Sequence, residues 1–581
     1  YGVFAMFQIA YGLGHGDMAL VETYRNDLYF ESAGTIITLI TVGKYLEAKS
    51  KGKTSEAIQK LMKLAPKTVT VLREDKEVVI SVSELLVGDI FVVRPGEQIG
   101  ADGVVIEGYS TVDESALTGE SIPVEKTLQS SVLSASINLN GTIKVEAKKV
   151  GEDTAFSKIL EIVDKASASK APIARLADKI AGVFVPIVMA ISLVTGILWL
   201  AFGSSITFAL SCAISVLVVS CPCALGLATP VAIMVGTGKG AGSGLLIKSG
   251  EALERAHSVD VVVLDKTGTI TKGKPVLTDI FAENREIEAE LLVAAATLEK
   301  NSEHPLAEAI LTYCEKENIV PKNCDEFIAV AGKGVEGKIN GVSYFGGNEK
   351  MLLDKKIALP TEVKEKAKNL AQLGKTLMYF GKEEEILGFV AVADVVKETS
   401  KEAIEKIKAL SVKVIMLTGD QSLTANAIGE EVGVDKVYAG VLPEEKGQVI
   451  EELQSQGLKV AMVGDGINDA PALALSDVGI AIGAGTDVAM ESADIILMKN
   501  DLLDVVNAIK LSKAVIRNIK QNLFWAFFYN RIGIPLAAGL FYPLWAIKLS
   551  PMFGAFAMSI SSLFVVSNAL RLRYVKLEKK S

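Results

Sequence analysis

The stretch Val259-Asp260-Val261-Val262-Val263-Leu264-Asp265-Lys266-Thr267-Gly268-Thr269 decides the fold of this chain. Its first part is apolar and β-branched, a pattern that predicts a buried parallel strand. A carboxylate at the C-terminal tip of such a strand lies where open α/β sheets bind their ligands. The sequence therefore predicts an α/β domain whose ligand site contains Asp265.

Two later apolar runs also end in acidic motifs. Residues 412–417 are followed by Thr418-Gly419-Asp420, and residues 459–463 lead into Gly464-Asp465-Gly466-Ile467-Asn468-Asp469. The carboxyl ends of parallel strands meet at one edge of a sheet. We therefore expect the carboxylates of these motifs to surround one pocket, namely Asp265, Asp420, Asp465 and Asp469.

The composition indicates a chain that is part membrane and part soluble. Its 581 residues are too many for one core, so several domains are expected. Half of the residues are apolar and the mean hydropathy is +0.36, yet 22% are charged. The net charge of −9 argues against general nucleic-acid binding. The cysteines are not spaced as a disulfide framework would require.

Six apolar segments predict transmembrane helices, because about 20 residues span a bilayer. They cover residues 1–14, 30–48, 181–202, 206–235, 522–542 and 549–570. Lysine and arginine gather where these segments meet the two large loops, 50–175 and 240–515. By the positive-inside rule, both loops and the C-terminus are expected in the cytoplasm. The first segment is short and no initiator Met precedes it, so we expect an incomplete N-terminus.

The pentapeptide Asp265-Lys266-Thr267-Gly268-Thr269 is the phosphorylation motif of P-type ATPases, and the chain resembles that family from end to end. The resemblance implies an α-helical transmembrane bundle, a haloacid-dehalogenase-like α/β phosphorylation domain, an α+β nucleotide-binding insert and a mainly-β actuator domain. The implied order is transmembrane helices 1–2 at 1–50, actuator at 51–171, helices 3–4 at 172–240, phosphorylation domain at 241–275 and 385–512, insert at 276–384, helices 5–6 at 513–574 and a tail at 575–581.

The resemblance also implies the chemistry of phosphoryl transfer. Asp265 would attack the γ-phosphate of ATP and become an aspartyl-phosphate. Mg²⁺ prefers hard oxygen ligands. By resemblance, it would be held by Asp265, Asp465 and the carbonyl of Thr267, with Asp469 as an additional candidate.

Further residues of the same domain are carried over from the family. Thr418 would hold a phosphate oxygen, and Lys446, in Pro443-Glu444-Glu445-Lys446, would neutralise the developing phosphoryl charge. Asp420 and Asn468 are expected to bind the nucleotide.

Position 267 separates a pump from a simple phosphatase. Haloacid-dehalogenase phosphatases usually carry Asp two residues after the nucleophile as a general acid and base, and this chain has Thr267. Its aspartyl-phosphate should therefore hydrolyse slowly without help. Thr118-Gly119-Glu120, within residues 113–121, resembles the actuator loop of the family, so Glu120 would orient water against phosphorylated Asp265. A membrane-anchored phosphatase is the alternative from another class.

The insert contains Ser302-Glu303-His304-Pro305-Leu306, which resembles the nucleotide-domain motif of heavy-metal P-type ATPases. The resemblance implies that Glu299 and His304 bind the adenine of ATP. Gly332 and Gly334 would permit close approach of the backbone to the nucleotide.

The fourth apolar segment contains Cys221-Pro222-Cys223. On a regular helix these two cysteines would point about 200° apart. Because Pro222 interrupts the hydrogen-bond ladder, an unwound turn can aim both sulfurs at one point. Thiolates select soft ions, especially Cu(I) and also Zn²⁺. The motif therefore predicts a metal site within the membrane.

The last two segments distinguish between these metals. Tyr529-Asn530 in the fifth and Met558 to Ser562 in the sixth match the copper-transporting group. Met558 and Ser562 share a helix face, and a thioether with neutral oxygens suits a soft monovalent ion. The zinc group carries a Lys in the fifth segment and Asp-x-Gly in the sixth, neither of which is present. The sequence thus predicts Cu(I) export, with Zn²⁺ or Cd²⁺ export as the alternative.

Three acidic residues lie at expected membrane edges. By resemblance, Glu47 and Asp178 would help ions to enter and Glu31 would help them to leave, while a solvated interfacial charge is the alternative for each. The expected partners are the lipid bilayer, ATP and a copper ion delivered by a cytosolic copper chaperone, with no nucleic acid. We expect a monomer in the plasma membrane.

Overall fold

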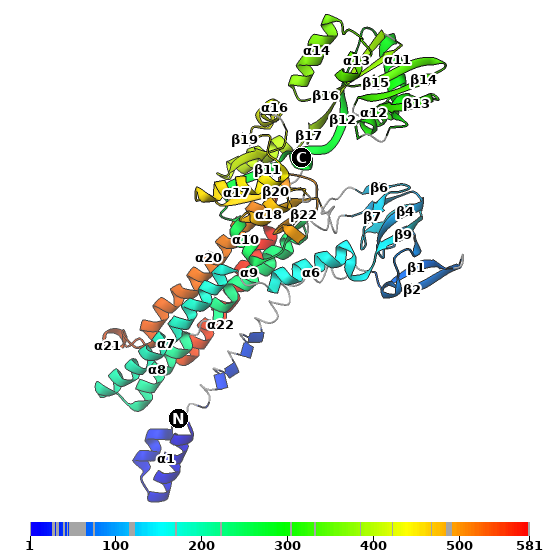
Figure 1. Ribbon diagram of the computed structural model, residues 1–581. Helices are drawn as coiled ribbons and strands as arrows, with labels where there is room; N and C mark the ends of the chain where they lie inside the picture. Colours follow the sequence, from blue (N-terminus) through cyan, green and yellow to red (C-terminus); the bar gives the residue numbers. More distant parts are fainter. Residues whose placement is uncertain are drawn as a thin grey trace. The chain divides into compact units, whose positions relative to one another are not determined.

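The chain divides into two compact units. The first comprises Tyr1–Ser258 with Ala508–Leu577, and the second comprises Val259–Asn507 with Glu578–Ser581 (Figure 1). The computed structural model describes residues 2–578 apart from 26–29, 31–33, 36, 39–40, 43, 46–65, 74–75, 115–122, 169–170, 221–222, 303–304, 331–332, 384, 421, 466–467 and 484–490.

The second unit is built on a parallel sheet with β11 (Val261–Asp265) at its centre. β18 (Lys413–Leu417) pairs with one side of β11 and β20 (Val460–Gly464) with the other. β19 (Lys436–Tyr438) extends the first side, and β21 (Val478–Ile482) and β22 (Ile495–Leu497) extend the second. The residues of β11 before Asp265 are fully buried, which explains their unbroken apolar run.

Helices alternate with these strands along the chain, as in doubly wound folds. They are α15 (Ser400–Ala409), α16 (Ser422–Val432), α17 (Lys446–Ser455) and α18 (Ala470–Leu475). Apolar residues of α17 and α18 pack with those of β11, β18 and β20 in one core cluster. The predicted α/β fold is confirmed for this unit.

An antiparallel sheet interrupts the parallel one after β11. β12 (Thr271–Ala282) leads out and β17 (Glu385–Val396) returns, paired with each other. The strand order is β12-β17-β16-β15-β14-β13, completed by β13 (Asp325–Val330), β14 (Gly334–Ile339), β15 (Val342–Gly347) and β16 (Thr376–Lys382).

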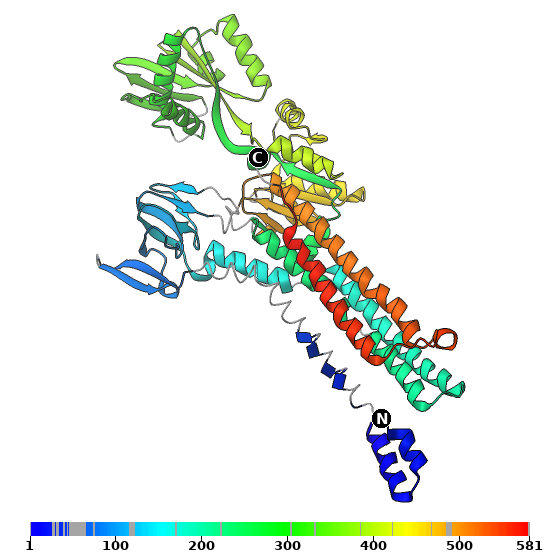
Figure 2. The same ribbon diagram turned by 180° about the vertical axis from the view of Figure 1, so that it is seen from behind.

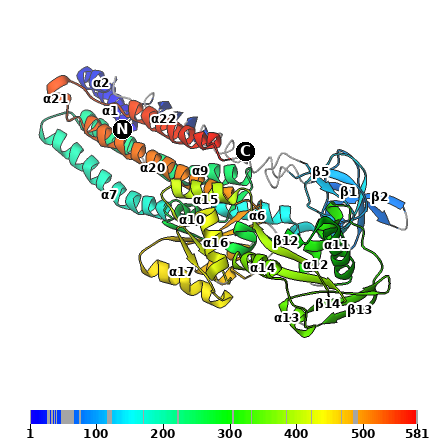
Figure 3. The same cartoon turned by 90° about the horizontal axis from the view of Figure 1, so that it is seen from above.

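The two faces of this sheet bury separate cores, because neighbouring residues of a strand point to opposite sides. Phe380 belongs to the core under α11 (Arg285–Glu299) and α12 (Pro305–Lys316). Tyr379 belongs to the core under α13 (Glu349–Asp354) and α14 (Thr361–Gln372). Figure 3 labels these four helices of the insert.

The first unit contains a mainly-β part, as predicted. Its larger sheet has the order β2-β1-β3-β9-β4-β7 and its smaller sheet the order β6-β5-β8. The strands are β1 (Thr68–Arg73), β2 (Lys76–Ser81), β3 (Ile90–Val93), β4 (Asp102–Gly108), β5 (Ser110–Asp113), β6 (Val124–Lys126), β7 (Ser131–Val132), β8 (Ile137–Asn138) and β9 (Ile143–Lys149).

The rest of the first unit is mostly helical. Its elements are α1 (Gly2–His15), α2 (Met18–Arg25), α6 (Ala155–Ala168), α7 (Pro172–Ala201), α8 (Ile206–Val219), α9 (Cys223–Ala241), β10 (Leu245–Ile247), α10 (Gly250–Ala256), α21 (Tyr542–Trp545) and α22 (Pro551–Leu570). The long helix α20 (Leu503–Ala537) begins in the second unit and continues here. Figure 2 shows α22, in red, alongside α8 and α9, which it contacts.

Two helices of the described residues are long and apolar enough to cross a membrane, α7 and the stretch Pro551–Tyr574 that contains α22. The apolar helix α8 is shorter, and segment 30–48 lies largely outside the described residues. Segment 206–235, expected as one span with an unwound turn at Pro222, contains α8, which ends at Val219, and α9, which begins at Cys223. Residues 221–222 of the Cys-Pro-Cys motif lie between these helices and outside the described residues.

Candidate functional site

Asp265 ends β11 at the edge of the sheet where β18 and β20 also end. Thr418 follows β18 and Asp465 follows β20, so three motifs separated in sequence meet at this edge. Asp265 is only 6% exposed. Three residues later, Gly268 adopts φ +73°, and a Cβ there would lie 3.0 Å from Oδ2 of Asp465. The glycine therefore allows the turn and the close approach of a second carboxylate.

Lys446 forms the centre of the charged cluster. Its Nζ donates hydrogen bonds to Oδ1 of Asp265 at 2.7 Å and to Oδ1 of Asp469 at 2.6 Å. All three side chains are buried. Oδ1 of Asp469 thus helps to position the lysine, while its Oδ2 has no hydrogen-bond partner among the described residues, so its role as a magnesium ligand stays a prediction.

Burial and the neighbouring carboxylate of Asp469 raise the pKa of Asp265 to about 6, although Lys446 acts in the opposite direction. Burial also acts to lower the pKa of Lys446, but the two carboxylates outweigh it and the net pKa is raised. The lysine is therefore held as a cation beside the nucleophile.

The donors at this edge fit a magnesium ion. Asp465 is exposed at the sheet edge, and partial burial of its carboxyl raises its pKa, so a nearby cation would stabilise the carboxylate. Oγ1 of Thr269 and Oδ2 of Asp469 are buried without a hydrogen-bond partner among the described residues. No group of three His, Cys, Asp or Glu residues that could hold a metal occurs in the described part of the chain. The ligands expected for magnesium remain Asp265, Asp465 and the carbonyl of Thr267, with Asp469 as an additional candidate.

Two lysines make contacts that hold the phosphorylation loop, which is the segment Lys266–Ile270 after Asp265. Neither contact was predicted from the sequence. Nζ of Lys266 pairs with Oδ2 of Asp420 at 2.6 Å, which joins the loop to the end of β18. Nζ of Lys397 donates to the carbonyl of Gly268 at 2.6 Å and to Oδ1 of Asn500 at 2.5 Å. Burial lowers the pKa of Lys397 to about 8.

Thr418 and Asn468 lie at the same sheet edge. Thr418 is buried, and its Oγ1 accepts a hydrogen bond from the backbone N–H of Asp420 at 3.1 Å. Asn468 is exposed beside the buried Asp469. These positions are compatible with the roles carried over for both residues.

The nucleotide residues of the insert are described only in part. Glu299 is buried at the end of α11, and burial raises its pKa while a hydrogen bond with Ser302 opposes the rise. His304 and Gly332 lie outside the described residues. Gly334 is needed for strand packing, because at φ +154° a Cβ would lie 2.1 Å from the carbonyl oxygen of Gly346.

We expect Gly334→Ala to destabilise the β14–β15 pair by roughly 2–5 kcal/mol, from backbone strain and overpacking together. Hydrogen–deuterium exchange of β14 and β15 in the purified chain measures this local opening. Gly341→Ala is the matched control, since Gly341 also has a positive φ, but a Cβ there would meet no atom within 4 Å. A larger loss at Gly341 than at Gly334 would contradict the steric explanation.

The helices of the first unit converge on the end of α8. A Cβ on Gly533 of α20 would lie 2.5 Å from Val219, and one on Gly554 of α22 would lie 2.8 Å from it. Val219 is the last residue of α8 and directly precedes Ser220 and the Cys-Pro-Cys motif. Glycine thus lets both helices approach the end of α8. Cys221 lies outside the described residues; Cys223 opens α9.

Uncharged side chains of α20 and α22 that carry O, N or S donor atoms are buried in the same bundle. Asn530, Met558 and Ser562 are 4%, 8% and 7% exposed. Oδ1 of Asn530 has no hydrogen-bond partner among the described residues, while its Nδ2 donates to the carbonyl of Ala526 at 3.1 Å. Tyr529 has Ser561 and Asn530 as side-chain hydrogen-bond neighbours. The donor set available here is neutral.

A chain of amides joins α9, α20 and α22. Nδ2 of Asn568 in α22 donates to Oδ1 of Asn522 in α20 at 2.8 Å. Asn522 in turn contacts Oδ1 of Asn518 at 3.2 Å and the carbonyl of Ala228 in α9 at 3.4 Å. Nδ2 of Asn518 closes the chain on the carbonyl of Asn568 at 2.9 Å.

The remaining acidic candidates are mostly untested by the structure. Glu120, Glu47 and Glu31 lie outside the described residues. Asp178 is exposed on α7.

Comparisons with known proteins agree with this architecture. A family model of haloacid dehalogenase-like hydrolases matches residues 259–477, and one of the P-type ATPase actuator domain matches residues 63–164. Copper-exporting P-type ATPases of Staphylococcus aureus strains Newman and COL are 49% identical over 562 residues, which is 96% of this chain and 68% of each relative.

Solved structures give the same result. A crystal structure of a zinc-transporting PIB-type ATPase matches with a TM-score of 0.63 and 32% identity, over 98% of this chain and 94% of that chain. A second crystal structure of a zinc-transporting PIB-type ATPase, in a different state, matches with a TM-score of 0.59 and 33% identity, over 93% and 87%. The motifs, the two sheets and these relatives lead to one conclusion: the chain belongs to the heavy-metal P-type ATPases.

Proposed function

We propose that this ATPase exports Cu(I) from the cytoplasm, with an aspartyl-phosphate on Asp265 as its intermediate. The observation that carries the choice of ion is the buried neutral donor set of Asn530, Met558 and Ser562 on α20 and α22, two helices that approach the end of α8 through Gly533 and Gly554. Soft thiolate and thioether ligands suit Cu(I). The copper-exporting relatives at 49% identity support the same ion.

The phosphorylation step follows from the charged cluster. Lys446 holds Asp265 from one side and leaves its second oxygen for in-line attack on the γ-phosphate. The same cation then lies beside the transferred phosphoryl group and stabilises its charge. Mg²⁺ bound by Asp265 and Asp465 would neutralise the phosphate oxygens.

Dephosphorylation needs a group from elsewhere in the chain. Thr267 cannot act as a general base, so the aspartyl-phosphate persists until Glu120 positions a water molecule against it. Hydrolysis then depends on conformation, and metal and phosphate can favour different states of the transporter.

Zn²⁺ or Cd²⁺ is the second candidate cargo, favoured by the similarity to zinc-transporting structures. A divalent ion in the membrane requires a counter-charge. The donor set of Asn530, Met558 and Ser562 is neutral and supplies no such counter-charge. The phosphatase alternative is set aside, because the chain matches the actuator domain and belongs to the ATPase family.

The setting of the pump is also a proposal. The excess of Lys and Arg beside the two large loops supports a cytoplasmic location for these loops and for the C-terminus. We place the chain in the plasma membrane as a monomer that receives copper from a cytosolic chaperone. Glu47 and Asp178 would assist ion entry, and Glu31 ion release.

Metal-stimulated ATP hydrolysis by the purified protein tests the proposed cargo. Under reducing conditions, Cu(I) is expected to stimulate hydrolysis and Zn²⁺ to have little effect. Cys221→Ser with Cys223→Ser should remove the stimulation, because two thiolate ligands are lost. Cys212→Ser is the matched control, since Cys212 is a buried thiol of α8 outside the motif. Stimulation by Zn²⁺ and not by Cu(I) would reject the copper assignment.

A further inference from the structure

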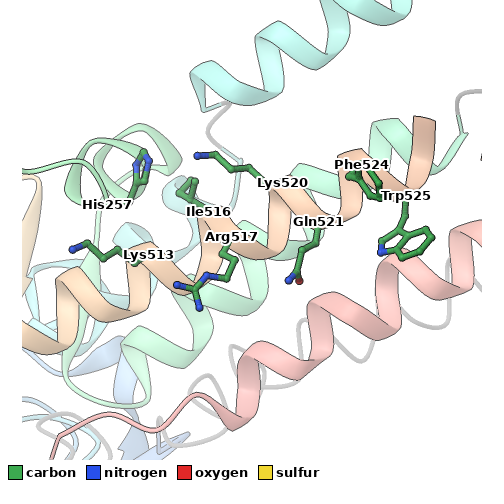
Figure 4. Close-up of a pocket in the computed structure, with 8 residues that line it drawn as sticks. All are labelled: His257, Lys513, Ile516, Arg517, Lys520, Gln521, Phe524 and Trp525. Atoms are coloured by element: carbon green, nitrogen blue, oxygen red, sulfur yellow. The ribbon is translucent and has the colours of Figure 1, made fainter. Parts of the chain in front are cut away.

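The middle of α20, where basic residues give way to aromatic ones, carries a pocket that the pump cycle does not use. All of its lining residues but one lie on α20, and the exception follows α10: His257, Lys513, Ile516, Arg517, Lys520, Gln521, Phe524 and Trp525 (Figure 4). Its volume is about 470 Å³. We propose that this pocket binds the headgroup of an anionic phospholipid, whose acyl chains lie along the aromatic end.

The charge of the pocket suits a phosphodiester. Lys513, Arg517 and Lys520 are spaced i, i+4 and i+7, so they share one face of α20. None of the residues that line the pocket is acidic. Arg517 and Lys520 are exposed and have no ion-pair partner among the described residues. An arginine fork can bind two phosphate oxygens at once, and a lysine adds a point charge.

The apolar end of the pocket suits the lipid tail. After Gln521, α20 carries no charged residue until Arg531. Phe524 and Trp525 are 58% and 45% exposed. Trp525 points toward α22, where its ring lies 6.0 Å from that of Phe564 (Figure 4). Tryptophan is enriched at the headgroup level of membranes, where an amphipathic ring is favourable.

The order of these groups along the helix distinguishes a lipid from a free anion. A cationic row is followed within one turn by exposed rings, which matches a headgroup followed by acyl chains. Basic pockets at the ends of transmembrane helices bind anionic headgroups in this way. The chain as a whole carries a net charge of −9, so a local basic cluster is not part of a general anion-binding surface. The proposal does not depend on which metal is transported.

Native mass spectrometry of the full chain in detergent tests the proposal, with phosphatidylglycerol and phosphatidylcholine as probes. The wild-type protein is expected to retain phosphatidylglycerol in preference to phosphatidylcholine. Arg517→Gln with Lys520→Gln should weaken this binding by about five-fold per cation and thus roughly 25-fold. Arg175→Gln with Lys179→Gln removes the same charge from the start of α7, outside the pocket, and should leave the binding nearly unchanged.

Three outcomes would overturn the proposal. The first is equal retention of the two lipids by the wild-type protein, which requires no variant to fold. The second is an equal loss in both double variants, which would indicate a general charge effect. The third is displacement of phosphatidylglycerol by inorganic phosphate with no effect of Trp525→Ala, which would assign the pocket to a free anion. None of these measurements involves metal stimulation, so failure of the copper assignment would be seen separately.

Discussion

Asp265→Asn is expected to abolish formation of the phosphoenzyme and to lower ATP hydrolysis by a factor on the order of 10⁵ to 10⁶, as for loss of a covalent nucleophile. The amide has nearly the same shape, so the loss reports the missing nucleophile. The acid-stable label transferred from γ-labelled ATP to the purified protein measures it directly.

This substitution should cost little stability. Asp265 is buried, and its pKa of about 6 reflects a carboxylate that is disfavoured by burial and by Asp469. Asp279→Asn is the matched control. Asp279 lies on the strand β12, away from the phosphorylation loop, and forms an ion pair with Lys375. Label that persists in Asp265→Asn, or that disappears equally in Asp279→Asn, would contradict the assignment of the nucleophile.

Lys446→Met is expected to reduce the rate of phosphorylation by about 10² to 10³, the effect of removing a positioned charge at the reacting centre. It should also destabilise the second unit by roughly 3–5 kcal/mol at neutral pH, because two buried carboxylates lose their shared cation. Rapid-quench phosphorylation and thermal unfolding measure the two effects.

The pH dependence of this variant has a definite sign. Only ionised Asp265 attacks ATP, so phosphorylation in the wild-type protein should fall as pH drops through about 6. Without Lys446 the pKa of Asp265 rises further, and the acidic limb moves to higher pH. Because protonated Asp265 no longer needs a cation, the stability difference between wild type and variant should narrow as pH falls. Lys413→Met, at the other end of β18, is the control.

The phosphorylation site was accessible from sequence because each of its strands ends directly in a functional motif. Asp265 and Asp465 follow uninterrupted apolar runs, and parallel strands bring their ends together. The contact between Lys397 and the phosphorylation loop could not be predicted from sequence, because its partner Gly268 is 129 residues away across the insert. No local pattern marks that contact. The signal available was the position of Lys397 directly after the returning strand β17.

In other parts the sequence indicated the residue but not its surroundings. The sequence suggested that Gly334 is a glycine so that the backbone can approach the nucleotide. The close backbone of β15 already requires a glycine at this position. The fourth apolar segment was expected to contain an unwound turn, but hydropathy alone did not divide it into α8 and α9. Hydropathy is an average over many residues, so it does not locate a helix end. That end is set by the backbone groups that lack a hydrogen-bond partner within the helix.

The amides of Asn518, Asn522 and Asn568 have a consequence for how this protein can change over evolutionary time. Each amide meets a hydrogen-bonding need of another in a dry interior, so replacing one leaves its neighbour unpaired. Single substitutions should therefore be selected against, while joint replacement by apolar residues is tolerable. We expect these three positions to be inherited as a set among descendants of this sequence.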